Sequence, residues 1–327
     1  MPVLISDFSP SFPFKNAHLN TIYRSVFTKE SNNYSRKRIT TWDNDFIDLD
    51  FSLVGSKILV LLIHGLEGSS KSNYIISTTN HLNKKGLDAV CFNLRGCSGD
   101  DNLLLGTYHS GKTEDVDFVI NHLLKNYNYD SIVILGFSLG GNLILKYIGE
   151  QAEKISPKIK VGIAISVPID IATGELELEK FKNKIYLNRF LKSMKTKILE
   201  KSEKFPELYI DKEKISKATR FKHLESVYTA PVFGFKNPED YWAKASSKPH
   251  LSKIKIPTLL INSKDDTFLS KKCYPFDEAN SSNSFFLEVT NYGGHCGFIS
   301  SFDNSKNSWL EDRIEKFIME NIQNLIL

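Results

Sequence analysis

A Gly-x-Ser-x-Gly motif holds the residue of this chain best suited to nucleophilic chemistry, Ser138. The apolar, β-branched run 132–135 leads into Gly136-Phe-Ser-Leu-Gly140, and a helix-compatible run follows over residues 142–149. A serine at so sharp a strand-to-helix turn takes a strained backbone conformation, which requires neighbours without a Cβ two positions away on either side. The glycines at the two ends of the motif meet this requirement. The motif therefore predicts a nucleophile elbow, with a reactive serine at the end of a strand.

An imidazole and a carboxylate must accompany such a serine, because the imidazole takes the hydroxyl proton and the carboxylate orients the imidazole. After an elbow of this kind the chain order is serine, acid, histidine, with the histidine in the loop after the last strand. His295 lies in Gly293-Gly-His-Cys-Gly297, directly after the strand-like run 284–289, and is the only histidine downstream of Asp266. We therefore predict His295 as the base.

Two adjacent aspartates, Asp265 and Asp266, follow the strand-like run 258–261 and are the candidates for the acid. Asp266 stands at the spacing of the Gly-x-x-Asp pattern usual after this strand, with Ser263 in place of the glycine. We predict Asp266 as the catalytic acid and Asp265 as a turn or capping residue. The exchanged assignment stays open at this point.

Two backbone N–H groups are candidates to stabilise a developing oxyanion. Leu139 follows the serine at the start of the predicted helix, where unpaired donors and the helix dipole favour negative charge. The second donor in such a sheet comes from the loop after a central strand, and here His64-Gly-Leu-Glu-Gly68 follows the apolar run 57–64. We assign this donor to Leu66 and expect His64 to orient the loop.

The elements that must carry these residues alternate along the chain. Apolar runs typical of strands buried on both faces occupy residues 57–64, 87–94, 131–135, 158–167, 256–262 and 284–289. Helical spacing occupies residues 72–85 and 112–127, and an amphipathic helix is expected over 306–325. Such alternation predicts an α/β fold with a mostly parallel, doubly wound sheet and a site at the carboxyl ends of the strands.

Two parts of the chain depart from this alternation. Residues 37–42 and 46–54 alternate polar and apolar side chains around a turn, which predicts an N-terminal antiparallel hairpin. Residues 168–249 carry lysine-rich runs with helical spacing, such as 176–197 and 212–223, and no convincing buried strand. We predict an inserted helical cap over 168–249, called the cap segment below, and a core made of residues 1–167 and 250–327. The lysines of the cap segment are read as a solvated face.

The composition is that of an ordinary globular protein, with 41% hydrophobic and 24% charged residues and a net charge of +4 over 327 residues. So weak a charge does not argue for nucleic acid as a partner. No apolar run approaches the ~18 residues of a transmembrane helix, and no signal-type segment opens the chain. We therefore expect a soluble, cytoplasmic protein with no membrane span. The four cysteines lack metal-site or disulfide-framework spacing, and we expect them to be reduced, with Cys91 buried in its strand.

Several longer motifs resemble one family, the YheT-like branch of the α/β-hydrolase superfamily, which includes ABHD1/2/3-type proteins and yeast medium-chain ester synthases. The resemblance spans nearly the whole chain. It is carried by His64-Gly-Leu-Glu-Gly-Ser-Ser70, Asn93-Leu-Arg-Gly-Cys-Ser-Gly99, Tyr108-His-Ser-Gly111, Gly136-Phe-Ser-Leu-Gly-Gly-Asn142, Asp265-Asp266 and Gly293-Gly-His-Cys-Gly-Phe298.

The resemblance implies an α/β-hydrolase fold and assigns the same residues as the reasoning above. These are the catalytic residues Ser138, Asp266 and His295 and the oxyanion donors Leu66 and Leu139. Thr267 departs from the proline that commonly follows the second aspartate in the family, which weakens the loop argument without removing a functional group.

The chemistry expected of such a site is hydrolysis of a carboxylic ester through an acyl-enzyme. This chemistry requires no metal and no organic cofactor. The substrate expected is a small-molecule acyl ester of short to medium chain length, because a helical cap suggests a covered apolar pocket. An alternative is acyl transfer to an alcohol, and a less favoured one is a non-catalytic binding module. The sequence leaves the oligomeric state open.

Overall fold

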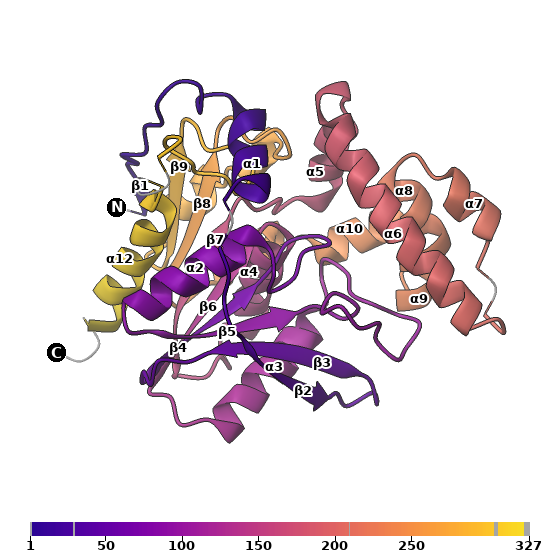
Figure 1. Ribbon diagram of the computed structural model, residues 1–327, viewed down its shortest axis with the longest axis horizontal. Coiled ribbons are helices and arrows are strands. Elements are labelled where there is room, and N and C mark those ends of the chain that lie inside the picture. The colour runs from indigo at the N-terminus through magenta and orange to yellow at the C-terminus, as the bar shows by residue number, and fades with distance from the viewer. Residues whose placement is uncertain (1, 29, 209, 304–306, 324–327) are drawn as a thin grey trace.

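A nine-stranded sheet runs through the molecule in the strand order β1-β9-β8-β7-β6-β4-β5-β3-β2. The computed structural model describes residues 2–28, 30–208, 210–303 and 307–323, and Figure 1 shows helices on both faces of the sheet. The strands are β1 (Val3–Leu4), β2 (Ser35–Thr40), β3 (Phe46–Ser52), β4 (Ile58–Ile63), β5 (Asp88–Asn93), β6 (Ser131–Phe137), β7 (Ile159–Ile165), β8 (Thr258–Ser263) and β9 (Phe285–Thr290).

The pairing of the strands confirms the predicted α/β class with a mostly parallel sheet. From β1 across to β5 all neighbouring strands are parallel. Strand β3 pairs antiparallel with both β2 and β5, so the predicted N-terminal hairpin forms one edge of the sheet. The central strand β4 is apolar, and its residues 59–63 are fully buried, as expected for a strand covered on both faces.

Helices cover the two faces of the sheet and bury alternate side chains of β4. Val60 and Leu62 belong to the hydrophobic cluster formed with helices α2 and α12, whereas Leu59, Leu61 and Ile63 belong to the cluster formed with α3 and α4. Because side chains alternate along a strand, these clusters lie on opposite faces. The helices of the core are α1 (Ala17–Val26), α2 (Asn73–Lys84), α3 (Thr113–Asn126), α4 (Leu139–Gln151), η4 (Lys271–Cys273), α11 (Phe276–Asn280) and α12 (Trp309–Gln323).

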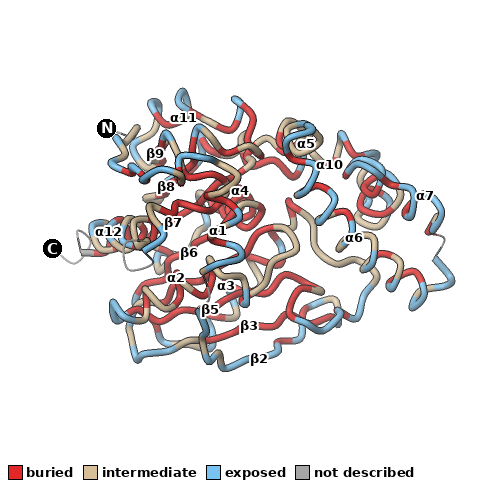
Figure 2. The backbone as a smooth tube through the Cα atoms, turned by 45° about the horizontal axis from the view of Figure 1, so that its top comes forward, coloured by how far each residue is buried: buried red, intermediate tan, exposed pale blue. Residues whose placement is uncertain are grey.

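In the described part of the chain between β7 and β8, all elements of regular secondary structure are helices. They are α5 (Ile171–Leu178), η1 (Phe181–Asn183), α6 (Lys184–Lys204), α7 (Lys212–Lys217), α8 (Phe221–Leu224), η2 (Glu225–Thr229), α9 (Ala230–Phe233), α10 (Pro238–Ala245) and η3 (Lys248–Lys253). A hydrophobic cluster within this segment includes Leu187, Leu191, Ile215 and Leu224. Figure 2 shows many exposed residues along α6 and α7. The boundaries of the cap segment, 168–249, stay a prediction.

Three details differ from the sequence-based expectations. Strand β1 was not expected; its two residues pair with β9 and extend the parallel edge of the sheet. The helical run 176–197 is divided, because α5 ends at Leu178 and α6 begins only at Lys184. The C-terminal helix spans Trp309–Gln323, and residues 306, 324 and 325 of the expected helix lie outside the described residues. No helix in the described ranges combines the length and the apolarity needed to cross a bilayer.

Candidate active site

Ser138 stands between β6 and α4 at a turn that depends on glycine neighbours. Its φ of 51° and ψ of −116° are values that residues with a side chain rarely adopt. A Cβ added at Gly136 would lie 2.4 Å from the carbonyl carbon of Gly140, and one added at Gly140 would lie 2.3 Å from the carbonyl oxygen of Ile63. The glycines therefore let the turn close on itself and on β4, and so hold Ser138 at the carboxyl end of β6.

His295 joins Ser138 and Asp266 in one hydrogen-bonded chain. Its Nε2 lies 2.9 Å from Ser138 Oγ, and its Nδ1 lies 2.8 Å from Asp266 Oδ2. Because a carboxylate only accepts, Nδ1 carries the ring proton and Nε2 can accept the serine proton. The second oxygen of Asp266, Oδ1, accepts from the N–H of Phe268 at 2.9 Å, which sets the orientation of the carboxylate.

Asp265 contacts the same loop at a different point. Its Oδ1 accepts a hydrogen bond from the N–H of Gly294 at 3.0 Å, while Ser263 Oγ donates to the carbonyl of Gly294 at 2.9 Å. Asp265 therefore holds the backbone next to His295, and the contact with the imidazole is made by Asp266. The contact joins two loops and does not close a local turn, so the turn or capping role expected for Asp265 stays a prediction.

The protonation of His295 reflects two opposing effects. Burial of the ring disfavours its charged form, but the charge of the Asp266 carboxylate and the hydrogen bond to it outweigh burial, so the pKa of His295 lies above its usual 6.5. A raised pKa makes the imidazole a stronger base for the serine proton.

Helix α1 supports the His295 loop through polar residues that were not predicted to belong to the site. Thr21 Oγ1 accepts from the N–H of His295 at 2.8 Å, and Arg24 donates to the carbonyl of Gly297 at 3.1 Å. Asn20 is completely buried and exchanges hydrogen bonds with the backbone of Ile299. The signal available in the sequence was a set of polar side chains on one face of a short helix, a face that in most helices would be apolar.

The two predicted oxyanion donors belong to segments that adjoin Ser138. Leu139 is the first residue of α4, so its N–H has no acceptor within the helix. In the loop after β4, the N–H groups of Gly65, Glu67 and Gly68 donate to Tyr74 Oη, Tyr108 Oη and Gly65 O respectively. The N–H of Leu66, by contrast, has no hydrogen-bond acceptor among the residues that the structure describes. A Cβ added at Gly65 would lie 3.1 Å from the Cβ of Ser138, so this loop passes close to the serine.

His64 orients this loop, as predicted. Its Nδ1 lies 2.7 Å from the carbonyl of Gly65, and its Nε2 accepts from the N–H of Leu94 at 3.1 Å. Burial lowers the pKa of His64 to about 4. The ring is therefore neutral near pH 7, with both nitrogens occupied by the backbone.

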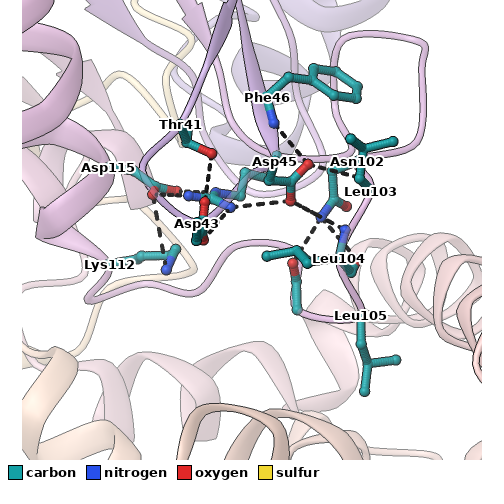
Figure 3. Close-up of polar contacts among 12 residues, drawn as sticks. Thr41, Asp43, Asp45, Phe46, Asn102, Leu103, Leu104, Leu105, Lys112 and Asp115 are labelled. Carbon is teal, nitrogen blue, oxygen red and sulfur yellow. Dashed lines mark hydrogen bonds and ion pairs between the residues drawn. The ribbon is translucent and has the colours of Figure 1, made fainter.

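Arg95 and the acids around it tie the loop after β5 to the hairpin. The guanidinium binds Asp115 through Nε and Nη2, and its Nη1 lies 2.8 Å from Asp43 and 3.1 Å from Asp45. Figure 3 shows Asp45 also accepting from Asn102 and from the backbone of residues 103 and 104. These contacts give Arg95 a structural role.

Cys91, Cys97, Cys273 and Cys296 are free and buried, and burial raises the pKa of Cys91 to about 12. No group of three or more His, Cys, Asp or Glu side chains among the described residues is placed to hold a metal ion.

Comparisons with known proteins agree with this architecture. A model of the α/β hydrolase fold family matches residues 58–302. The chain is 28% identical over 319 residues to the putative esterase YheT of Escherichia coli K12, covering 96% of this chain and 93% of that protein. It is also 28% identical over 334 residues to phospholipase ABHD3 of Bos taurus, covering 98% of this chain and 80% of that protein.

A solved structure has the same fold. The esterase Pf2001 of Pyrococcus furiosus superposes with a TM-score of 0.58 at 20% identity, covering 89% of this chain and 92% of that one. The resemblance inferred from the motifs is thus confirmed, and the chain belongs to the α/β hydrolase fold family, with the YheT-type esterases and ABHD phospholipases among its relatives.

Proposed function

We propose that this protein is a serine hydrolase that cleaves carboxylic esters through an acyl-enzyme. The observation that carries the proposal is the hydrogen-bonded chain in which His295 lies 2.9 Å from Ser138 Oγ and 2.8 Å from Asp266 Oδ2. Relatives whose names include esterase, phospholipase and monoacylglycerol lipase support the same reaction class.

The proposed reaction begins with attack of Ser138 Oγ on the ester carbonyl carbon while Nε2 of His295 takes the hydroxyl proton. Asp266 stabilises the imidazolium that forms, and the N–H groups of Leu66 and Leu139 bind the oxyanion. The carbon–oxygen bond to the alcohol then breaks, and the alcohol leaves with the proton from His295. Water, deprotonated by His295, attacks the acyl-serine and releases the acid.

Aromatic side chains beside the proposed base favour an apolar substrate. The ring of Phe268 stacks on His295 with centroids 4.2 Å apart, and Tyr186 of α6 packs against Phe268 at 4.8 Å. A short- to medium-chain acyl group would be buried against these rings, which bind apolar surface without requiring hydrogen bonds.

The test is hydrolysis of a series of p-nitrophenyl esters from acetate to decanoate, measured for the parent protein and for Ser138→Ala and His295→Ala. We expect each substitution to lower kcat by at least about 10³-fold, with a folded protein by circular dichroism. A fluorophosphonate probe should label the parent and not Ser138→Ala. Product analysis with added ethanol separates hydrolysis from transfer to an alcohol. An inactive and unlabelled parent, or an active Ser138→Ala, would contradict the proposal.

A further inference from the structure

The first turn of α6 and the short helix before it expose large apolar side chains. Phe181 is 90% exposed and Ile185 is 78% exposed, compared with 60% for Leu176 and 46% for Leu208 elsewhere in the cap segment. Exposing a phenylalanine and an isoleucine this far forgoes the free energy that burial would provide. Clustered exposed apolar side chains rimmed by polar residues are typical of an interaction surface.

Unpaired cations surround these side chains. Lys182, Lys184, Arg189 and Lys192 are exposed, and none of them has an ion-pair partner among the residues that the structure describes. Most of the other cap-segment lysines lie within 4.0 Å of an acidic group; these are Lys180, Lys197, Lys201, Lys204, Lys212, Lys214, Lys217, Lys222, Lys244 and Lys248. The free positive charge of the segment is therefore concentrated beside Phe181 and Ile185.

Ile185 and two of the cations share one side of α6. Ile185, Arg189 and Lys192 follow the i, i+4, i+7 spacing of a single helical face, and Phe181 precedes Ile185 by one further turn, in η1. The opposite face of α6 carries Leu187 and Leu191, which are buried in the cap-segment cluster. We call residues 181–192 the cap tip.

We propose that the cap tip docks onto a lipid bilayer that contains anionic phospholipid. Phe181 and Ile185 would enter the boundary between headgroups and acyl chains, while the free lysines and Arg189 meet the phosphate groups. We choose a lipid surface because of charge complementarity. Cations without acidic partners lie beside two exposed apolar side chains, and this combination binds anionic membrane interfaces.

A groove on the Leu187 side of α6, next to the face that carries Ile185 and Arg189, adds a second feature suited to lipid. It has a volume of about 780 Å³ and runs between α6 and residues 218–220. Leucines such as Leu187 and Leu199 line it together with Lys184, Lys195 and Arg220. Glu179 also lines the groove and pairs with Arg220 at 3.6 Å. The lysines of the lining, Lys184, Lys192 and Lys195, have no ion-pair partner among the described residues, and together with the leucines they suit an amphipathic anion.

The cap tip is joined to the acid loop of the candidate site. Asn183 donates to the carbonyl of Thr267 at 2.6 Å and accepts from Thr267 Oγ1 at 2.7 Å, directly beside Asp266. Docking would therefore bring the bilayer surface next to the triad. Delivery of a lipid ester to Ser138 by this route rests on the proposed function, whereas the docking itself does not.

The experiment is sedimentation with vesicles of phosphatidylcholine containing about a third phosphatidylglycerol, using full-length Ser138→Ala so that binding is read without turnover. We expect the protein to sediment with these vesicles and not with pure phosphatidylcholine, and salt to weaken the binding. Phe181→Ser with Ile185→Ser should lower the partition coefficient about tenfold or more. Lys182→Gln with Lys184→Gln should lower it about fivefold for each lysine.

Matched variants test whether the position matters. Leu53→Ser with Val54→Ser removes two apolar side chains that are 53% and 52% exposed and that lie outside the cap segment. Lys212→Gln with Lys217→Gln removes two lysines of the cap segment that have acidic partners. Both should bind vesicles like the parent.

Absence of binding to anionic vesicles, or equal binding by the cap-tip variants and the control variants, would overturn the proposal. So would a dimer in sedimentation velocity that Phe181→Ser with Ile185→Ser abolishes, because the cap tip would then bind a second copy. Hydrolysis of p-nitrophenyl acetate tests the proposed function separately.

Discussion

At the scale of single residues, the neighbouring aspartates differ in what they touch. Asp266 has no exposed side-chain surface and contacts Nδ1 of His295, whereas Asp265 accepts from the backbone of Gly294. A carboxylate at Nδ1 is needed to hold the ring tautomer and to stabilise the imidazolium. The chemical demands on the two side chains are therefore different, although their positions in the sequence are adjacent.

We predict that Asp266→Asn lowers kcat about 10⁴-fold, because the amide keeps the shape of the side chain but presents a donor or an uncharged acceptor to Nδ1. Asp265→Asn is the matched control, since its amide oxygen can still accept from Gly294, and activity should stay within about threefold of the parent. Steady-state hydrolysis of a p-nitrophenyl ester measures both. A larger loss in Asp265→Asn than in Asp266→Asn would reverse the assignment.

The raised pKa of His295 predicts a pH dependence. The imidazole accepts the serine proton only when it is neutral, so kcat/KM should rise with pH and level off above the pKa of His295, which the Asp266 carboxylate holds above 6.5. In Asp266→Asn the stabilising charge is gone while burial persists, so the residual activity should reach its plateau at lower pH. A profile that rises with a midpoint below 6.5 in the parent would contradict this.

At the scale of secondary-structure elements, helix α1 acts as a support for the loop that carries His295. The glycines of that loop allow the close contact: a Cβ at Gly294 would lie 2.5 Å from the carbonyl oxygen of Ala17, and one at Gly297 would lie 2.2 Å from Asn20 Oδ1. Thr21 is buried and bonds the His295 N–H. The position of the imidazole thus depends on a helix almost the full length of the chain away.

Thr21→Val should lower both stability and kcat. Valine keeps the volume but leaves the N–H of His295 without its acceptor, which costs about 1–3 kcal/mol of the free energy of unfolding and loosens the ring relative to Ser138. Urea denaturation and ester hydrolysis measure the two effects. Ser25→Ala, one turn along α1 at an exposed position, is the control and should leave both unchanged. Equal behaviour of the two variants would show that α1 does not position His295.

At the scale of the whole molecule, contacts with one loop of the core hold the far end of α6. Lys201 is buried and bonds the carbonyls of Asn102 and Leu104, and it pairs with Asp101 at 2.9 Å. The same loop is attached to Asp45 of the hairpin, as Figure 3 shows for residues 102–104. At its other end α6 is attached to Thr267 through Asn183. Helix α6 is therefore connected to the core at both ends.

We predict that Lys201→Met lowers the free energy of unfolding by about 1–3 kcal/mol, because it leaves the carbonyls of Asn102 and Leu104 without their buried donor. Lys204→Met removes an exposed partner of Asp101 and should change stability little, since exposed pairs contribute weakly. Urea denaturation compares the two, and limited proteolysis should cut the cap segment faster in Lys201→Met alone. Similar stability of both variants would mean that the buried contact does not anchor α6.

Local sequence patterns were sufficient to predict the core strands, the order of the elements and the residues that meet at the candidate site. Apolar runs of strand length specify buried parallel strands wherever they stand. Parallel strands end at a common edge, so Ser138, Asp266 and His295 could be expected to converge there from chain order alone. Of the two aspartates, spacing favoured Asp266, and the contact with His295 is consistent with that choice.

Tertiary packing decided what local patterns could not. Strand β1 has only two residues, too few for a periodic signal, and it forms because β9 offers it an open edge. The support of His295 by Thr21 joins positions 274 residues apart. Whether a lysine of the cap segment is paired or free depends likewise on which acids the fold brings near, and only the three-dimensional structure shows that the free cations gather at the cap tip. Each of these features is a contact between distant segments, and its energy exists only after the chain has folded.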